Sequence, residues 1–219
     1  AHAFLALHRA YRQTQERLAS LDAALDRPSA APWPWEEVRD FFHYCDNYID
    51  AVDRAAEHFA QKQGGHRNIR VAAVSTLGNS DIAVDFADTD RLRHFDTETR
   101  TLKISRRAPP ETQTFQLLLQ VALVKQNALL DATLDLARFH SAEARAIAKI
   151  GLANYFAGAA LMPYETFQQA AIACRHDLEV LAGQFGASIE QVAHRLSTLQ
   201  RPGAKGIPFF FVRVDQAGT

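Results

Sequence analysis

The chain has 219 residues, of which 47% are hydrophobic and 22% charged, a composition typical of a globular protein with a sizeable core. Its formal net charge of −1 excludes a strong global attraction to nucleic acid or to an anionic membrane surface. No apolar run reaches the roughly 20 residues of a membrane-spanning helix. The two cysteines, Cys45 and Cys174, are far apart, which predicts no disulfide framework and favours the reducing cytoplasm. Because the chain opens on Ala1 and its single methionine is Met162, we expect a fragment of a longer protein.

Helical periodicity dominates the N-terminal part. Apolar residues recur at spacings of three and four over 4–25 and again from Val38 to about residue 63, where a Gly-Gly pair provides a C-terminal signal. The intervening RPSAAPWPW (27–35) has three prolines and predicts a short, stiff connection. We therefore expect two long helices that make 1–63 a helical segment for linkage or dimerisation.

The apolar pattern then changes to that of strands. Short segments that are β-branched or alternating, with turn residues between them, predict three or four strands in a meander, at 69–77, 82–87, 92–96 and 101–105. The segment 115–124 is apolar almost all round and predicts a buried helix. Further periodic segments predict helices over 141–160, 163–174, 177–185 and 188–200, followed by a strand over 207–214. The predicted fold class is α+β, with long N-terminal helices, a small β-sheet and then a helical half.

Motifs for common catalytic chemistry are absent. The sequence has no GxSxG, P-loop or GxGxxG motif, and none of its nine histidines has HExxH spacing. Residues 178–196 place Ala182, Gly186 and Val192 at helix-turn-helix spacing. This pattern fits either a helical hairpin in the core or a DNA-contacting unit, and Glu190 near the start of the second helix favours the hairpin because it would repel phosphate.

Cations gather on the predicted sheet. The stretch RTLKISRR (100–107) has four cations in eight residues, and Lys103 faces away from Leu102 and Ile104 if the segment is a strand. The group is either a solvated sheet face or a phosphate-binding patch, since the guanidinium fork matches phosphate. The candidate phosphate ligands are Arg91, Arg93, Arg100, Lys103, Arg106, Arg107 and Lys125. If these are only solvated, the remaining candidates are Arg39, Arg195, Arg201 and Lys205.

Four segments together resemble a known family: EEVRDFFHYCDNYIDAVDRAAE (36–57), FQLLLQVALV (115–124), ANYFAGAALMPYETF (153–167) and HRLSTLQRPGAKGIPFFFVRVDQAG (194–218). They are similar to the XRE-type short-chain fatty acyl transcriptional regulators of acetate and propionate metabolism. From residue 66 onward the chain resembles the ImmA/IrrE-type domain, whose fold is similar to zinc metallopeptidases (zincin-like). The resemblance implies that 66–219 is an effector-sensing domain of a cytoplasmic, homodimeric regulator. DNA would be bound by a helix-turn-helix domain outside this chain, and no membrane is involved.

The resemblance also implies that the peptidase metal site is lost. In ImmA-type peptidases the helix that corresponds to 115–124 carries the two histidines and the glutamate of the metal motif, and a further glutamate precedes the segment like 153–163. Here the matching positions are Leu119, Gln120, Leu123 and Leu152. Zinc needs N, O or S donors, and an amide cannot take up a proton as a base. We therefore expect no metal and no catalytic residue.

CoA or a short-chain acyl-CoA is the effector that the resemblance implies. An apolar slot for the acyl chain would be lined by Leu119, Leu123, Leu152 and Tyr155, and the sheet cations would hold the phosphates. Adenine would stack on Tyr44, Tyr48, Phe95 or Tyr155. Two alternatives stay open, namely a dimerisation or structural module without a ligand and direct DNA contact through 178–196.

Overall fold

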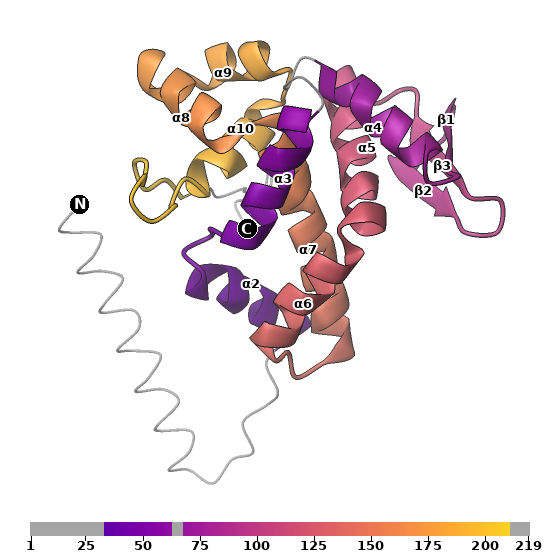
Figure 1. Ribbon diagram of the computed structural model, residues 1–219, viewed down its shortest axis with the longest axis horizontal. Helices are drawn as coiled ribbons and strands as arrows, with labels where there is room; N and C mark the ends of the chain where they lie inside the picture. Colours follow the sequence, from indigo (N-terminus) through magenta and orange to yellow (C-terminus); the bar gives the residue numbers. More distant parts are fainter. Residues whose placement is uncertain (1–32, 63–67, 211–219) are drawn as a thin grey trace, which may run out of the picture. The chain divides into compact units, whose positions relative to one another are not determined.

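The computed structural model describes residues 33–62 and 68–210, and from Pro34 onward they belong to one compact unit (Figure 1). The helix predicted over 4–25 lies outside the described residues. The elements in chain order are α2 (Pro34–Tyr44), α3 (Asp50–Lys62), α4 (Ile69–Gly78), β1 (Ala83–Ala87), β2 (Arg93–Asp96), β3 (Thr101–Ser105), α5 (Pro110–Lys125), α6 (Asn127–Ala137), α7 (Ala142–Leu161), α8 (Tyr164–Ala173), α9 (Leu178–Phe185) and α10 (Ile189–Ser197). The predicted α+β class is confirmed.

Helices α5 and α7 form the centre of this unit. Helix α5 buries most of its length, as its nearly all-round apolar sequence predicted. Helix α7 faces it with small residues such as Ala153, Ala157 and Ala160, which let the two helices approach closely. The sheet and α4 pack on one side of α5, while α2, α3, α6 and α10 pack on α7 (Figure 1).

The sheet is not the predicted meander. Its strand order is β1-β3-β2, with β3 parallel to β1 and antiparallel to β2. The central strand carries Leu102 and Ile104, which are both fully buried against the helices. The most buried strand therefore occupies the middle. The connection from β1 to β2 passes the end of β3, where Ser105 donates from its hydroxyl to the Thr89 carbonyl at 2.9 Å.

The segment predicted as a first strand, 69–77, is instead helix α4. Its buried residues are Ile69, Ala72, Ala73 and Leu77, whose spacing is that of a helix face. The β-branched Val71 and Val74, which suggested a strand, are 72% and 37% exposed. The strand prediction was wrong because the β-branched residues lie on the exposed face of a helix, while the buried residues have helical spacing.

The long helix predicted from Val38 to residue 63 is broken into α2 and α3. At the break, Asp46 and Asn47 have φ angles of 53° and 56°, and the Asn47 N–H donates to the Phe42 carbonyl at 2.8 Å. Asp and Asn tolerate left-handed backbone better than other residues with side chains. Two consecutive left-handed residues interrupt the helix, although the apolar spacing continues on both sides.

The C-terminal half follows its predicted pattern. Helices α7 to α10 lie at the predicted segments, Asp177 caps α9, and Ser188 with Gln191 forms the predicted capping box of α10. The turn at Gly186 has φ 59°, so 178–196 is a helical hairpin. Helix α6 is an additional element that the sequence reading did not identify. Residues 207–210 have no regular secondary structure, contrary to the predicted strand, and 211–214 lie outside the described residues.

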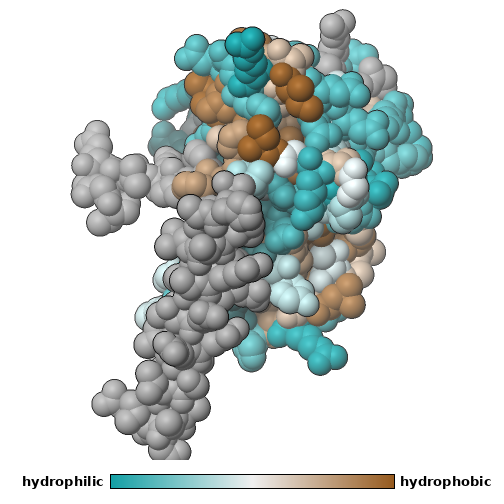
Figure 2. Space-filling model, turned by 90° about the vertical axis from the view of Figure 1, so that its left-hand side faces the viewer, coloured by the Kyte–Doolittle hydropathy of each residue, from teal (hydrophilic) through white to brown (hydrophobic). Residues whose placement is uncertain are grey.

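Exposed apolar residues are spread over several elements, for example Leu136 on α6, Ile150 on α7 and Ile172 on α8. On the face drawn in Figure 2, hydrophobic residues form small groups separated by hydrophilic ones. Within the described ranges, no single helix has both the length and the apolar character needed to cross a membrane. In the same ranges, α5 and α6 meet the length and apolar criteria only when they are taken together, and they are bent by 78° at their junction.

Two glycines in α7 provide a test of its packing. A Cβ on Gly158 would meet only the Phe115 ring, at 4.0 Å, whereas one on Gly151 would lie 2.9 Å from the Phe42 ring. Alanine is favoured over glycine in a helix by about 1 kcal/mol. We expect Gly158→Ala to raise the free energy of unfolding by roughly 0.5–1 kcal/mol, and Gly151→Ala to give less or to destabilise. Chemical denaturation measures both, and equal gains would show that Phe42 does not pack on α7.

Candidate functional site

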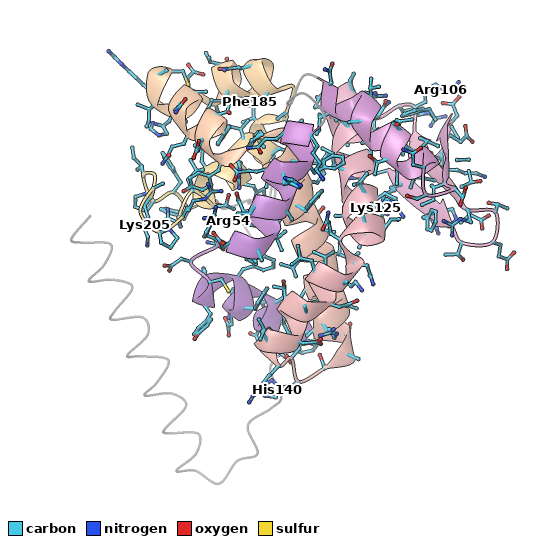
Figure 3. The ribbon with its side chains drawn as sticks, viewed as in Figure 1. Arg54, Arg106, Lys125, His140, Phe185 and Lys205 are labelled. Carbon is cyan, nitrogen blue, oxygen red and sulfur yellow. The ribbon has the colours of Figure 1, made fainter. Side chains whose placement is uncertain are left out.

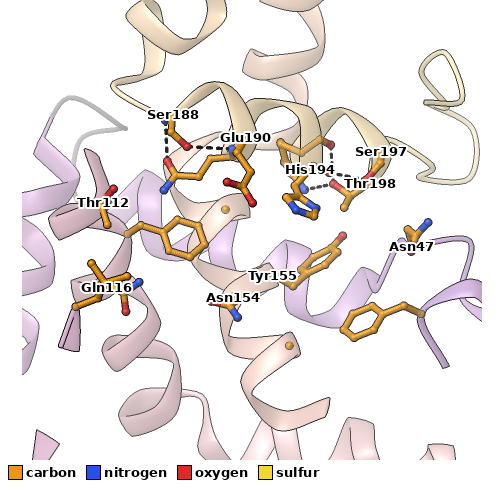
Figure 4. Close-up of a pocket in the computed structure, with 17 residues that line it drawn as sticks. Asn47, Thr112, Gln116, Asn154, Tyr155, Ser188, Glu190, His194, Ser197 and Thr198 are labelled. Atoms are coloured by element: carbon orange, nitrogen blue, oxygen red, sulfur yellow. Dashed lines mark hydrogen bonds between the residues drawn. The ribbon is translucent and has the colours of Figure 1, made fainter. Parts of the chain in front are cut away.

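A cavity of about 680 Å³ opens between α5, α7 and α10 (Figure 4). Volumes of 300–1,000 Å³ are usual for pockets that bind small molecules. The lining residues are Thr112, Phe115 and Gln116 on α5, Gly151, Asn154, Tyr155 and Gly158 on α7, Ser188, Glu190, Gln191, His194, Arg195, Ser197 and Thr198 on and around α10, and Phe42, Asn47 and Leu92. The cavity is therefore built by segments that are far apart in the sequence.

The α7 wall follows from helix geometry. Its four lining residues are spaced at i, i+3, i+4 and i+7, so they lie on one face of the helix. Gly151 and Gly158 leave the backbone bare at both ends of this face, while Asn154 and Tyr155 project between them. Phe42 and Phe115 flank the glycines, which makes much of the wall aromatic.

The α10 wall is oriented by its capping box. The Gln191 N–H donates to Ser188 Oγ at 3.2 Å, and the Ser188 N–H donates to Gln191 Oε1 at 2.9 Å. The first turn of α10, which a DNA-binding hairpin would present to bases, faces the cavity instead (Figure 4). Partial burial lowers the pKa of His194 below its ordinary value and outweighs the opposing effect of Glu190, so the imidazole is neutral at neutral pH.

The base of the cavity rests on a buried ionic group that we call the Asp53 cluster, consisting of Asp53, Tyr155, Arg195 and Arg201. Asp53 has no exposed surface. Its Oδ2 accepts from Arg195 Nη1 at 2.6 Å and from the Tyr155 hydroxyl at 2.8 Å. Its Oδ1 accepts from Arg201 Nη2 at 3.0 Å. Four elements thus meet at one carboxylate: α3, α7, α10 and the segment after α10.

The cluster fixes the charge state of the cavity wall. Burial, and then the Asp53 carboxylate, raise the pKa of Tyr155 well above its ordinary value, so its hydroxyl stays protonated and donates. Burial alone would lower the pKa of Arg195, but Asp53, Tyr155 and Glu57 together outweigh it and the pKa is raised. Arg195 therefore remains a cation that is neutralised within the protein, and the wall offers little free positive charge.

Arg201 connects the cluster to further residues. It donates to Glu57 Oε2 at 2.6 Å and to the Tyr48 hydroxyl at 2.7 Å, and its guanidinium lies 4.1 Å from the centre of the Tyr164 ring. Among the described residues, every buried side-chain nitrogen and oxygen has a hydrogen-bond partner. A fully paired group of this kind makes the fold rigid and is sensitive to the loss of any member.

The structure does not gather the predicted phosphate ligands on one surface. Four of them have local partners: Arg93 bonds to Gln120, Arg100 to the carbonyls of Ser80 and Asp81, Arg106 to the Phe86 carbonyl, and Arg107 to Asp88 and Asp90. The side chains of Arg91, Lys103 and Lys125 have no partner within 33–62 and 68–210. Figure 3 shows Arg106 and Lys125 well apart.

Strand alternation explains part of this separation. Arg93 lies opposite Ile104 in the register of β2 and β3, so it shares the inner face and reaches Gln120 on α5. Lys103 lies opposite His94 on the outer face. Arg91 precedes Leu92, which lines the cavity, so it is the candidate without a partner that is nearest in sequence to the lining.

The predicted acyl-slot residues fall in two groups. Tyr155 lines the cavity, whereas Leu119 and Leu152 are 4% and 0% exposed in the core and Leu123 packs against it. The cavity therefore begins about one helical turn before Leu119 along α5. Of the predicted adenine partners other than Tyr155, Tyr48 is buried beside Arg201, Tyr44 is 87% exposed and Phe95 packs on the core. In the described part of the chain, no three His, Cys, Asp or Glu side chains are grouped to hold a metal ion.

Sequence reasoning missed several of these residues, but two signals were present. Gly151 and Gly158 lie seven residues apart in a predicted helix, where glycine is otherwise unfavourable. Asp53 falls within the apolar stripe of Tyr48, Val52 and Ala56, and a charged residue at such a position indicates a buried ion pair. The polar lining residues Asn154 and Gln116 gave no comparable signal.

The Asp53 cluster predicts a large and specific effect on stability. Asp53→Asn keeps the shape of the side chain but leaves Arg195 buried without its counterion, so we expect the free energy of unfolding to fall by about 3–5 kcal/mol. The matched control is Asp40→Asn, which removes an exposed pair with Arg39 and should change it by less than about 1 kcal/mol. Urea denaturation measures both free energies of unfolding. Similar changes in the two variants would contradict the assignment of Asp53 as the buried counterion of Arg195.

Comparison with known structures supports the fold. A solved structure described as a Mycobacterium tuberculosis transcriptional regulator is similar with a TM-score of 0.81 at 41% sequence identity, over 86% of this chain and 59% of that chain. Residues 77–197 match the family described as IrrE N-terminal-like domain. Residues 198–219 match the family described as short-chain fatty acyl coenzyme A regulator, C-terminal.

Curated relatives align over the whole of this chain. A propionyl-CoA carboxylase regulator from Cereibacter sphaeroides is 68% identical, over 48% of its own length. The HTH-type transcriptional regulators PrpR and RamB from Mycobacterium tuberculosis are 41% and 39% identical, over 47% and 48% of their lengths. The chain therefore spans about half the length of the curated relatives that it matches.

Proposed function

Because the chain belongs to the IrrE N-terminal-like domain family, in agreement with the resemblance in its sequence, we propose that it is the effector-sensing part of a transcriptional regulator of short-chain fatty acid metabolism. Its effector is CoA or a short-chain acyl-CoA, and it has no enzymatic activity of its own. The regulator acts in the cytoplasm as a homodimer and binds DNA through another domain. The names of the relatives, all of them regulators, support this role.

The observation that carries the proposal is the cavity between α5, α7 and α10. Its walls combine aromatic rings and bare helix backbone with the side-chain amides of Asn154 and Gln116. Arg195 is neutralised by Asp53, and Glu190 repels anions. Such a site suits an uncharged, extended group with amide bonds, which is the chemistry of an acyl-pantetheine arm.

The phosphates of the effector stay outside the cavity in this arrangement. Leu92 places one end of the cavity beside the loop between β1 and β2, and the adjacent Arg91 has no side-chain partner among the described residues. We assign Arg91 as the first phosphate contact. Lys103 lies on the outer face of the sheet, whereas Arg93 lies on the inner face. Lys125 lies at the far end of α5, roughly 20 Å along the helix from Thr112.

Calorimetric titration with acetyl-CoA and propionyl-CoA tests the proposal. Gly158→Leu adds a side chain to the α7 wall and improves helix propensity, so we expect a stable protein with affinity reduced about tenfold or more. Arg91→Ala removes a charge-assisted contact and should also weaken binding about tenfold, whereas the matched control Lys125→Ala should stay within about twofold.

Three results would count against parts of this proposal. Absence of heat with the native chain at tens of micromolar ligand would overturn the effector role. Native affinity in Gly158→Leu would place the ligand outside the cavity. Equal losses in Arg91→Ala and Lys125→Ala would indicate a diffuse electrostatic effect, which raised salt would then abolish.

A further inference from the structure

We propose that the Asp53 carboxylate couples occupancy of the cavity to the segment that follows Thr198, residues 199–206, because it binds the cavity residues Tyr155 and Arg195 and also binds Arg201 of the segment. The inference rests on the proposed function, because it requires a ligand in the cavity. It adds a route by which the occupied state reaches the part of the regulator that comes next in the chain.

The cavity side of the coupling consists of residues with two roles. Tyr155, Arg195 and Thr198 all line the cavity. Tyr155 and Arg195 also donate to Asp53 Oδ2, at 2.8 and 2.6 Å, and Arg195 Nη1 donates to Thr198 Oγ1 at 3.0 Å. A ligand that packs on the Tyr155 ring or on Thr198 therefore acts directly on groups that hold the carboxylate.

The other oxygen of the same carboxylate, Oδ1, binds both the segment and Arg195, whose Nη2 donates to it at 3.4 Å. Asp53 Oδ1 accepts from Arg201 Nη2 at 3.0 Å, and Arg201 is 8% exposed. A carboxylate is planar and rigid, so the two oxygens move together. A displacement imposed at Oδ2 consequently changes the bond at Oδ1, and in the buried setting no water is at hand to compensate for it.

The position of residues 199–206 depends on a few such bonds. The Arg201 N–H donates to the Tyr164 hydroxyl at 2.9 Å, and the Ala204 carbonyl accepts from Tyr164 and Gln168 at 2.9 and 2.8 Å. The Gly206 N–H donates to the Leu199 carbonyl at 2.8 Å. The segment has no helical or strand ladder of its own, so its attachment is side-chain chemistry that can be released locally.

The segment lies just beyond the boundary between the two family matches. Residues from 198 onward match the C-terminal family of short-chain fatty acyl coenzyme A regulators, whereas most of the cavity lining belongs to the IrrE N-terminal-like match at 77–197. The Asp53 cluster thus spans the junction between the two matches. Coupling requires two states that both sites bias, and these are the attached and the released forms of the segment.

Amide hydrogen exchange of the whole chain, with and without propionyl-CoA, tests the coupling. The reporters are the amides of Arg201, Ala204 and Gly206. If release of the segment requires the ligand to leave, exchange slows by the factor one plus the ratio of ligand concentration to Kd, about a hundredfold at a hundred times Kd. We expect at least about a tenfold slowing. The control amides are Glu98 and Thr99, in the turn after β2, which should not change.

Two variants test the same route without depending on the ligand. Tyr155→Phe removes the hydroxyl that donates to Asp53, and Thr198→Val removes the oxygen that accepts from Arg195. Both should speed exchange at Arg201, Ala204 and Gly206 by about fivefold or more in the free protein, as expected for a weakened local attachment. Thr133→Val, which removes a hydroxyl on α6 away from the cavity, should have no effect there.

The outcomes separate the two proposals. If propionyl-CoA gives heat but the reporter amides respond neither to it nor to the two variants, the coupling is overturned and the effector role stands. If no heat is observed, the effector role fails and the coupling to occupancy fails with it. A response of the control amides equal to that of the reporters would show global stabilisation and would also overturn the coupling.

Discussion

The buried carboxylate of Asp53 determines how the helices around it pack together. Asp53 has no access to water, and a buried charge is tolerated only when it is paired and fully hydrogen-bonded. Its partners come from α7, α10 and the segment after α10, so these elements must converge before the charge is satisfied. The pairing draws α10 across α7 and fixes the segment after it. The cavity is the space that remains beneath α10 when this requirement is met.

The cavity stays open because contacts at the ends of its helices hold the walls in place. Arg195 anchors α10 to Asp53, and the capping box at Ser188 fixes the other end of the same helix. On α7, glycines at 151 and 158 place no side chain in the space, while Phe42 and Phe115 pack beside them. By contrast, the positions of Leu119 and Leu152 are filled by close packing. Leu119 lies about one turn of α5 beyond the lining residue Gln116, and Leu152 directly follows the lining residue Gly151 on α7 but is buried in the core.

Local patterns predicted the elements whose stability is local. The caps at Asp177 and Ser188 and the turn at Gly186 depend on neighbouring residues, and the helices there lie as predicted. The break at Asp46 and Asn47 and the helix at 69–78 were missed because tertiary packing decides them. The cationic patch was predicted from residues that are close in the sequence. Adjacent strand residues such as Arg93 and His94, however, face opposite sides of the sheet. The cavity joins segments more than a hundred residues apart, which no local pattern encodes.

The glycine at 158 has a consequence for how such a protein can change over generations. Any residue with a side chain except proline would improve the helix at this position, and the nearest atom leaves room for a Cβ. Selection for stability alone therefore favours filling the position, and only a need for the empty volume opposes it. A substitution there makes the cavity smaller and the protein more stable at the same time. A lineage in which a smaller cavity is sufficient would meet no barrier at this residue, so the volume of the cavity and the stability of the fold evolve in opposite directions at position 158.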